Sequence, residues 1–161
     1  MLISRLDQDT VAITKLDRTC CELLTQIVSS ADPGDSDAAR ARIFSTPTHG
    51  REPGADRDWH EYVEPDLVRL FQGALEIVQA DLAEFPPDNR RREHTLHLPV
   101  KNLEAWIHAL NQARLAIAAR YDFTEEDMDA PLSLISDART MALFQMHFYG
   151  FLQECFLRQL D

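Results

Sequence analysis

The chain has 161 residues, is 45% hydrophobic and carries a formal net charge of −11. This length suits one globular domain spanning residues 1–161 and is short for two. The acidic charge argues against nucleic acid as a partner, because attraction to phosphate needs a basic surface or stripe. The N-terminus lacks a signal peptide, and no apolar run approaches the roughly 18 residues of a membrane helix. We therefore expect a cytoplasmic protein without membrane contact.

The first third of the chain predicts a small β-hairpin, a helix and an irregular loop. Two alternating apolar segments, 2–6 and 10–14, flank the polar triplet Asp7-Gln8-Asp9, as in a hairpin with a polar turn. A helix is expected from about Leu16 to Ser30, with Asp17 at the positive end of its dipole. Residues 31–40 form a turn-rich break.

The segment 41–63 is expected to be an ordered loop rather than a free linker. It contains two prolines and two glycines, which break regular structure, yet it also contains Phe44, Trp59 and Tyr62. A disordered segment usually lacks such aromatics. We expect these side chains to pin the loop to the domain.

Three further helices and one strand are predicted in the remainder. A helix starting near Pro65 ends before residues 86–89, and Asp81 lies on its apolar side. Residues 94–98 alternate like a strand that pairs with the hairpin. Another helix covers 99–121, and Thr124 is expected to cap a short helix that follows it. The last helix runs over 137–160 and is apolar nearly all round, so we expect it to be central in the core. The predicted fold is mainly α, a four-helix bundle-like domain with a small antiparallel β element.

The helix over 99–121 carries the most informative polar residues. Its apolar stripe includes Trp106, and Arg114 and Asn111 lie on or beside it. A lone buried charge is prohibitive, so Arg114 is either a structural lock or part of a ligand site. As a lock it would reach a carboxylate of a neighbouring helix, with Asp81 and Glu154 as candidates, whereas as a site it would hold a small anion or a peptide carboxylate.

Other catalytic chemistries find little support. The six histidines lack metal-ligand spacing, so no metal and no cofactor is predicted. There is no nucleophile motif and no glycine-rich phosphate loop. The three cysteines are expected to be reduced, with Cys20 and Cys155 packed and Cys21 more exposed. The basic run 90–92 is interpreted as a solvated loop.

The segment 105–115, AWIHALNQARL, resembles the W-L-x-A-L-N-x-x-R-L core of a bacterial family, domain of unknown function number 2017. Residues 148–154, FYGFLQE, are similar to the ending of that family, and the resemblance covers about 58–161. The chain departs from the family pattern at Ala119, where a glycine usually precedes the arginine, and at Phe151, where a tryptophan is common. The resemblance implies no catalytic residues. Some relatives are encoded beside the adaptor of the Clp protease, which implies a link to protein turnover.

The leading hypothesis is a non-enzymatic protein that binds another protein, motivated by the missing catalytic constellation and by the aromatic segment from Phe44 to Tyr62. The alternative is a small anionic-ligand binder or an enzyme with a pocket around Arg114, Asn111 and Trp106. The sequence does not determine the oligomeric state.

Overall fold

The computed structural model describes residues 1–83, 85, 93–129 and 137–160. In these parts the chain is mainly helical, with one small antiparallel sheet of strand order β1-β2-β3, which confirms the predicted fold class. The strands are β1 (Leu2–Arg5), β2 (Thr10–Leu16) and β3 (His94–Pro99). The helices are α1 (Arg18–Thr25), α2 (Ile27–Ala31), α3 (Asp37–Ile43), α4 (Pro53–Tyr62), α5 (Glu64–Ala83), α6 (Leu103–Tyr121), α7 (Glu125–Asp129) and α8 (Ala138–Leu160).

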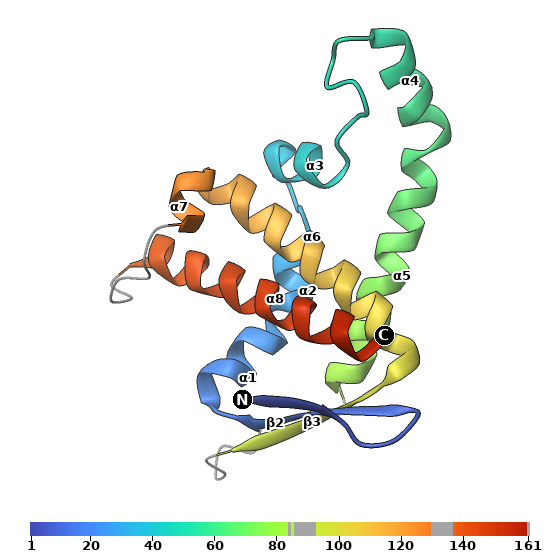
Figure 1. The fold of residues 1–161 in the computed structure, drawn as a ribbon. Helices are drawn as coiled ribbons and strands as arrows, with labels where there is room; N and C mark the ends of the chain where they lie inside the picture. Colours follow the sequence, from blue (N-terminus) through green and yellow to red (C-terminus); the bar gives the residue numbers. More distant parts are fainter. Residues whose placement is uncertain (84, 86–92, 130–136, 161) are drawn as a thin grey trace.

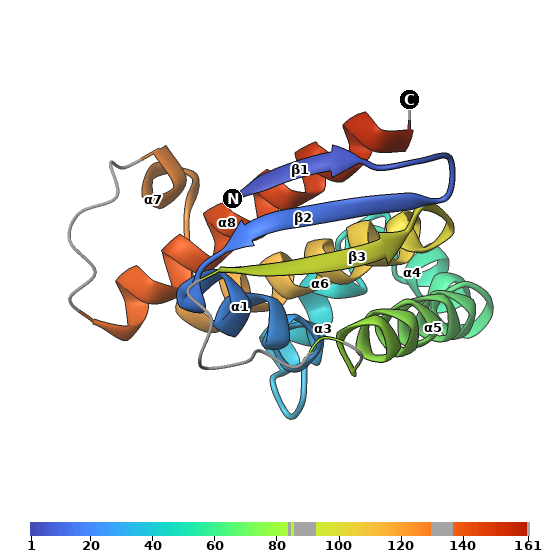
Figure 2. The same ribbon diagram turned by 90° about the horizontal axis from the view of Figure 1, so that it is seen from below.

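The sheet forms where the alternating segments predict it. The Asp7 carboxylate accepts the backbone N–H of Asp9 at 2.8 Å and so stabilises the hairpin turn. The other edge of β2 pairs with β3, with Val11 opposite Leu98. In β3, Leu96 and Leu98 alternate with more exposed residues, whereas Val11, Ala12 and Ile13 of β2 are all buried. The sheet covers one face of the helical layer (Figure 2).

The central helix is α6, which α2, α3, α5 and α8 surround (Figure 1). The expectation that the last helix is central is wrong in this respect, because Phe151 and Leu157 of α8 are about half exposed. The physical reason is side-chain size: the buried alanines of α6 let neighbouring helices approach closely on several sides. These alanines are Ala109, Ala113 and Ala116.

The predicted helix over 16–30 is two helices. Strand β2 continues through Leu16, so the first helix starts at Arg18, and the Asp17 carboxylate caps it by accepting the N–H of Cys20 at 2.8 Å. A tight turn at Gln26 separates α1 from α2. Cys21 is buried and Cys20 only partly so, the reverse of the expectation, because Cys21 shares the core-facing side with Leu24.

The expected loop over 41–63 is wrong for most of its length. The helix α3 begins within the supposed break, where the Ser36 hydroxyl accepts the N–H of Ala39 at 3.2 Å, and α4 begins at Pro53. The turn between α3 and α4 is held from α4, where the buried carboxylate of Asp56 accepts hydrogen bonds from Thr48 and from the N–H of Gly50. The prolines and glycines, which usually break regular structure, therefore mark the starts of helices and one short turn here.

The apolar residues form two clusters that meet along α6. The larger cluster lies between the sheet and α1, α2, α5, α6 and α8. The smaller one consists of Ala39, Ile43, Phe44 and Ala116, against which Trp59 and Phe71 pack. Two aromatics of the predicted loop thus face inward, while Tyr62 is 68% exposed. The segments 86–89 and 90–92 lie outside the described residues. Within the described parts, each helix is too short or too polar to cross a bilayer.

Candidate functional site

The five residues singled out from the sequence do not form one site. Trp106 and Arg114 both belong to α6 but are eight residues apart, which is about 12 Å along a helix axis. Each lies in a separate cluster of polar contacts, one toward α5 and the other toward α8. The two clusters are therefore considered in turn.

The first cluster is centred on Asp81 of α5. Its carboxylate accepts the indole N–H of Trp106 at 2.8 Å and the side-chain amide of Asn102 at 2.9 and 3.1 Å. Trp106 is fully buried, and Asn102 ends the short 3-10 turn (Val100–Asn102) between β3 and α6. Hydrogen bonds to a charged group are stronger than neutral ones. Asp81 is therefore a structural lock that ties α5 to the start of α6.

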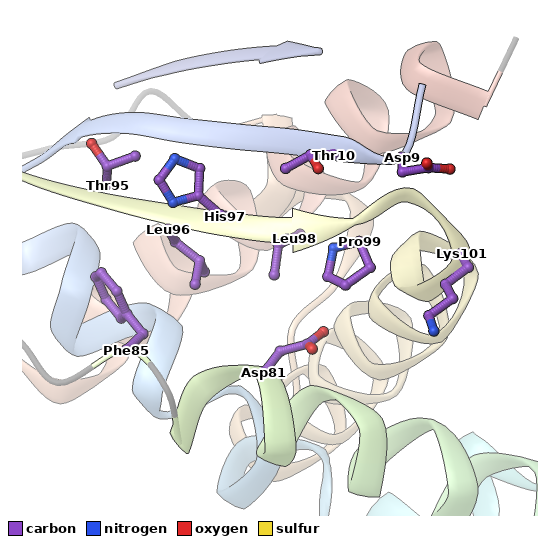
Figure 3. Close-up of a pocket in the computed structure, with 10 residues that line it drawn as sticks. All are labelled: Asp9, Thr10, Asp81, Phe85, Thr95, Leu96, His97, Leu98, Pro99 and Lys101. Atoms are coloured by element: carbon purple, nitrogen blue, oxygen red, sulfur yellow. The ribbon is translucent and has the colours of Figure 1, made fainter. Parts of the chain in front are cut away.

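A cavity of about 640 Å³ lies beside this lock, between β3 and α5 (Figure 3). Leu96 and Leu98 point from the strand toward α5, and Phe85 faces them just beyond the end of that helix. Its lining mixes apolar side chains with polar and charged ones, and the Asp81 carboxylate already accepts hydrogen bonds from two side chains. Its lining comprises Asp9, Thr10, Asp81, Phe85, Thr95, Leu96, His97, Leu98, Pro99 and Lys101.

The second cluster is centred on Arg114. Its guanidinium donates from Nη1 to the side-chain oxygen of Gln153 on α8 at 2.7 Å, and the Gln153 amide donates to the Ile107 carbonyl at 3.1 Å. Gly150 of α8 lies against the guanidinium, and a Cβ there would lie 3.4 Å from Arg114 Cζ, an ordinary van der Waals contact. The Nε atom of Arg114 is buried and finds no acceptor among the described residues.

The expected pairing of Arg114 with Asp81 or Glu154 is wrong. Asp81 is engaged by Trp106, and Glu154 is exposed and lies 3.7 Å from Arg158 of the next helical turn. Gln153, one residue before Glu154, is the side chain that α8 directs toward α6. The guanidinium is thus held by a neutral acceptor.

Asn111 is exposed and lies beside Arg114 rather than in the core. Together with Arg42 of α3, both line a small cavity of about 220 Å³. Thr124 adds a hydroxyl and Glu125 a carboxylate to the same lining. Two guanidinium groups and an amide in one small cavity are the kind of donors that hold an oxyanion.

The cysteines are poor nucleophiles at neutral pH. Burial raises the pKa of Cys20 to about 11, and burial also raises the pKa of Cys21 and of Cys155. The reactive thiolate is therefore scarce. Across the described ranges, His, Cys, Asp and Glu side chains do not gather in a group of three that could hold a metal ion.

The sequence prediction does not include Asn102 and Gln153 of these clusters, Arg42 of the small cavity, or the buried Gln112. The two amides Asn102 and Gln153 carry no charge, so the charge pattern of the sequence does not indicate them as partners, although Gln153 directly precedes Glu154. Arg42 comes from a segment predicted as loop. Gln112 is only 3% exposed although it falls off the predicted apolar stripe.

The fold and the two clusters define a mainly helical domain with a three-stranded sheet, in which polar side chains lock α6 to α5 and α8. The chain belongs to the family described as Domain of unknown function (DUF2017), which it matches over residues 4–160. No curated protein and no solved structure is significantly similar to it.

Proposed function

We propose that this protein acts in the cytoplasm as a non-enzymatic binding protein, and that it docks a helix of another protein along α5. The observation that carries the proposal is an exposed apolar row on this helix. Val63 at the junction with α4, Leu70 and Ile77 are 42%, 52% and 39% exposed.

The spacing of this row suits a helical partner. The three side chains recur every seven residues, and Gly73 and Ala80 follow three residues after Leu70 and Ile77. A seven-residue repeat of apolar positions is the pattern along which two helices wind around each other. A Cβ at Gly73 would meet nothing within 4 Å, so a partner helix can approach closely there. We call Val63, Leu70, Gly73, Ile77 and Ala80 the α5 face.

The charge around the α5 face selects the partner. Helices α4 and α5, residues 53–83, contain seven carboxylates and two arginines, a formal charge of −5. The N-terminal part of this unit projects beyond the other helices (Figure 1). A second copy of the chain would bring the same negative charge, so like-charge repulsion disfavours self-association. The expected occupant is an amphipathic helix with Lys and Arg beside its apolar residues.

Site-specific photo-crosslinking tests this proposal. A benzophenone amino acid replaces Leu70 in the full chain, and a matched variant carries it at Phe151, a side chain of similar exposure on α8. In lysate of the source organism, we expect a discrete adduct from position 70 only. Ile77→Asp in the same chain should abolish it, because a carboxylate would enter the apolar seam.

The crosslinked peptide must carry apolar residues at helical spacing flanked by Lys or Arg, and adduct formation must weaken as salt is raised. Equal adducts from positions 70 and 151, or an acidic crosslinked segment, would contradict the proposal. The identity of the captured protein also tests the link to protein turnover that the family resemblance implies.

The cavity between Arg42 and Arg114 favours a second candidate, the binding of a small oxyanion. Its support is the pair of guanidinium groups and the Nε of Arg114, for which the described part of the chain supplies no acceptor. Inorganic phosphate, titrated at constant ionic strength, should raise the melting temperature of the wild type and leave that of Arg42→Ala unchanged. Arg57→Ala, which removes an exposed arginine outside the cavity, serves as the control. An equal response of all three proteins would reject the site.

A further inference from the structure

Gln112 of α6 is a polar side chain that lies buried in the fold. It is 3% exposed, and its Nε2 atom finds no acceptor among the residues that the structure describes. An unsatisfied buried polar group costs about 1–3 kcal/mol, and in a native structure it calls for an explanation. A ligand that supplies the missing acceptor is such an explanation.

Gln112 forms part of the floor of a groove of about 620 Å³. The groove follows the seam between the two apolar clusters: Val28 and Leu75 belong to the larger one, and Phe44, Val68 and Phe71 to the smaller. Its volume lies within the range of about 300–1,000 Å³ typical of small-molecule sites. Predominantly apolar walls around one buried polar group are also typical of such sites.

The charges at the groove indicate that its ligand is neutral. Of the described residues that line it, Arg40 and Asp32 are the charged ones, and both are exposed. The Arg40 guanidinium is engaged by Glu64 at 3.1 Å and lies over the Phe44 ring. The Asp32 carboxylate accepts the N–H of Gly34 at 2.9 Å. The remaining polar side chains are hydroxyls and amides. An anion would therefore find no unengaged positive charge, and a cation would gain little from the exposed, hydrated Asp32 carboxylate.

We propose that this groove, here called the Gln112 groove, binds an uncharged and largely apolar small molecule whose carbonyl or similar acceptor pairs with the Gln112 amide. The apolar body lies against Val68, Phe71 and Leu75. The site is separate from the α5 face and from the cavity at Arg114, and it does not depend on the function proposed for either.

The test uses Nile red, an uncharged apolar dye with a carbonyl group, and the full-length protein. We expect saturable binding of one dye per chain with a blue-shifted emission. Val68→Trp, which fills the groove, should abolish binding. Glu76→Trp, which places the same ring elsewhere on α5, should leave the dissociation constant unchanged.

Gln112→Met separates a ligand-binding role from a structural one. The nearly isosteric thioether removes the unpaired donor, so the free protein should melt at a higher temperature, while dye affinity should fall about fivefold or more with the loss of one hydrogen bond. A merely structural amide would change the melting temperature and leave the dye affinity intact. Unchanged affinity in either Gln112→Met or Val68→Trp would overturn the proposal.

Two further outcomes would also overturn it. The anionic dye 8-anilinonaphthalene-1-sulfonate should not displace Nile red, so full competition would contradict an uncharged ligand. Dye binding that weakens as the protein concentration rises would show that a second copy of the chain fills the groove.

Discussion

Gly150 lies directly beneath the guanidinium of Arg114. A Cβ at this position would lie 3.4–3.6 Å from three guanidinium atoms, which is ordinary van der Waals contact. Glycine inside a helix costs about 0.5–1 kcal/mol relative to alanine. We therefore predict that Gly150→Ala stabilises the protein by about that amount in urea unfolding.

Gly73→Ala in α5 is the control, because a Cβ there meets open space. This variant should change the free energy of unfolding only through the higher helix propensity of alanine. If Gly150→Ala destabilises while Gly73→Ala stabilises, the guanidinium packs against α8 more tightly than the distances indicate. Gly150→Val should destabilise in any case, because its second methyl group must displace the guanidinium.

Arg114 itself should contribute moderately to stability. Removing one partner of a buried ion pair costs about 3–5 kcal/mol, but Arg114 is only partly buried and its acceptor is the neutral Gln153. We predict that Arg114→Ala lowers the free energy of unfolding by about 1.5–3 kcal/mol, the range for hydrogen bonds to charged groups.

Gln153→Glu is the informative companion, since it places a carboxylate opposite the same guanidinium. The gain of an ion pair is offset by the loss of the amide donor to the Ile107 carbonyl, which a carboxylate cannot replace, so we expect little net change in stability. A cost above about 4 kcal/mol for Arg114→Ala would mean that a carboxylate neutralises the guanidinium after all.

At the scale of elements, Asp56 holds the turn that joins α3 to α4. Its carboxylate accepts the Thr48 N–H at 3.2 Å, the Thr48 hydroxyl at 2.7 Å and the Gly50 N–H at 2.6 Å. Burial raises the pKa of Asp56, but these hydrogen bonds outweigh it and hold the pKa below its ordinary value. The turn therefore depends on one ionised side chain.

We predict that Asp56→Ala opens this turn, which contains Arg51, and that trypsin then cleaves after Arg51 several times faster than in the wild type. Mass spectrometry of timed digests measures the rate. Asp58→Ala removes an exposed carboxylate from the same helix and should leave cleavage unchanged. Equal cleavage in the Asp56 variant and the wild type would show that the packing of Phe44 and Trp59 alone orders the segment.

For the molecule as a whole, the buried Tyr149 phenol and the partly buried Cys20 thiol predict a loss of stability in alkali. Burial raises the pKa of Cys20 to about 11 and the pKa of Tyr149 to about 12, from ordinary values of 9.0 and 10.0. Between pH 9 and pH 12 the unfolded chain therefore loses protons that the folded chain retains. Because the folded state then binds more protons, the free energy of unfolding falls as pH rises.

Urea unfolding at a series of pH values from 7 to 11 measures this dependence. Cys20→Ala should flatten the curve above pH 9, since it removes one of the titrating groups. A wild-type curve that stays level to pH 11 would contradict the burial of these groups in the folded chain.

The sequence by itself determined the features that depend on neighbouring residues. The polar triplet after Leu6 specifies the hairpin turn, alternation specifies β3, and periodicity specifies α5, α6 and α8. The exchange of hydrogen bonds between Thr124 and Asp127 at the start of α7 was also predictable, because both residues lie within one helical turn. Such signals act over a few residues, so no knowledge of the rest of the chain is needed to recognise them.

Only the tertiary structure decided which distant groups meet. Nothing near Arg114 in the sequence indicates Gln153, and nothing near Asp81 indicates Trp106 and Asn102, because the docking of α6 against α5 and α8 sets these distances. The same docking buries Gln112 and turns Phe44 inward. Helix periodicity identifies a face that can be buried, but the size of the side chains on all the neighbouring helices determines how far burial extends around it.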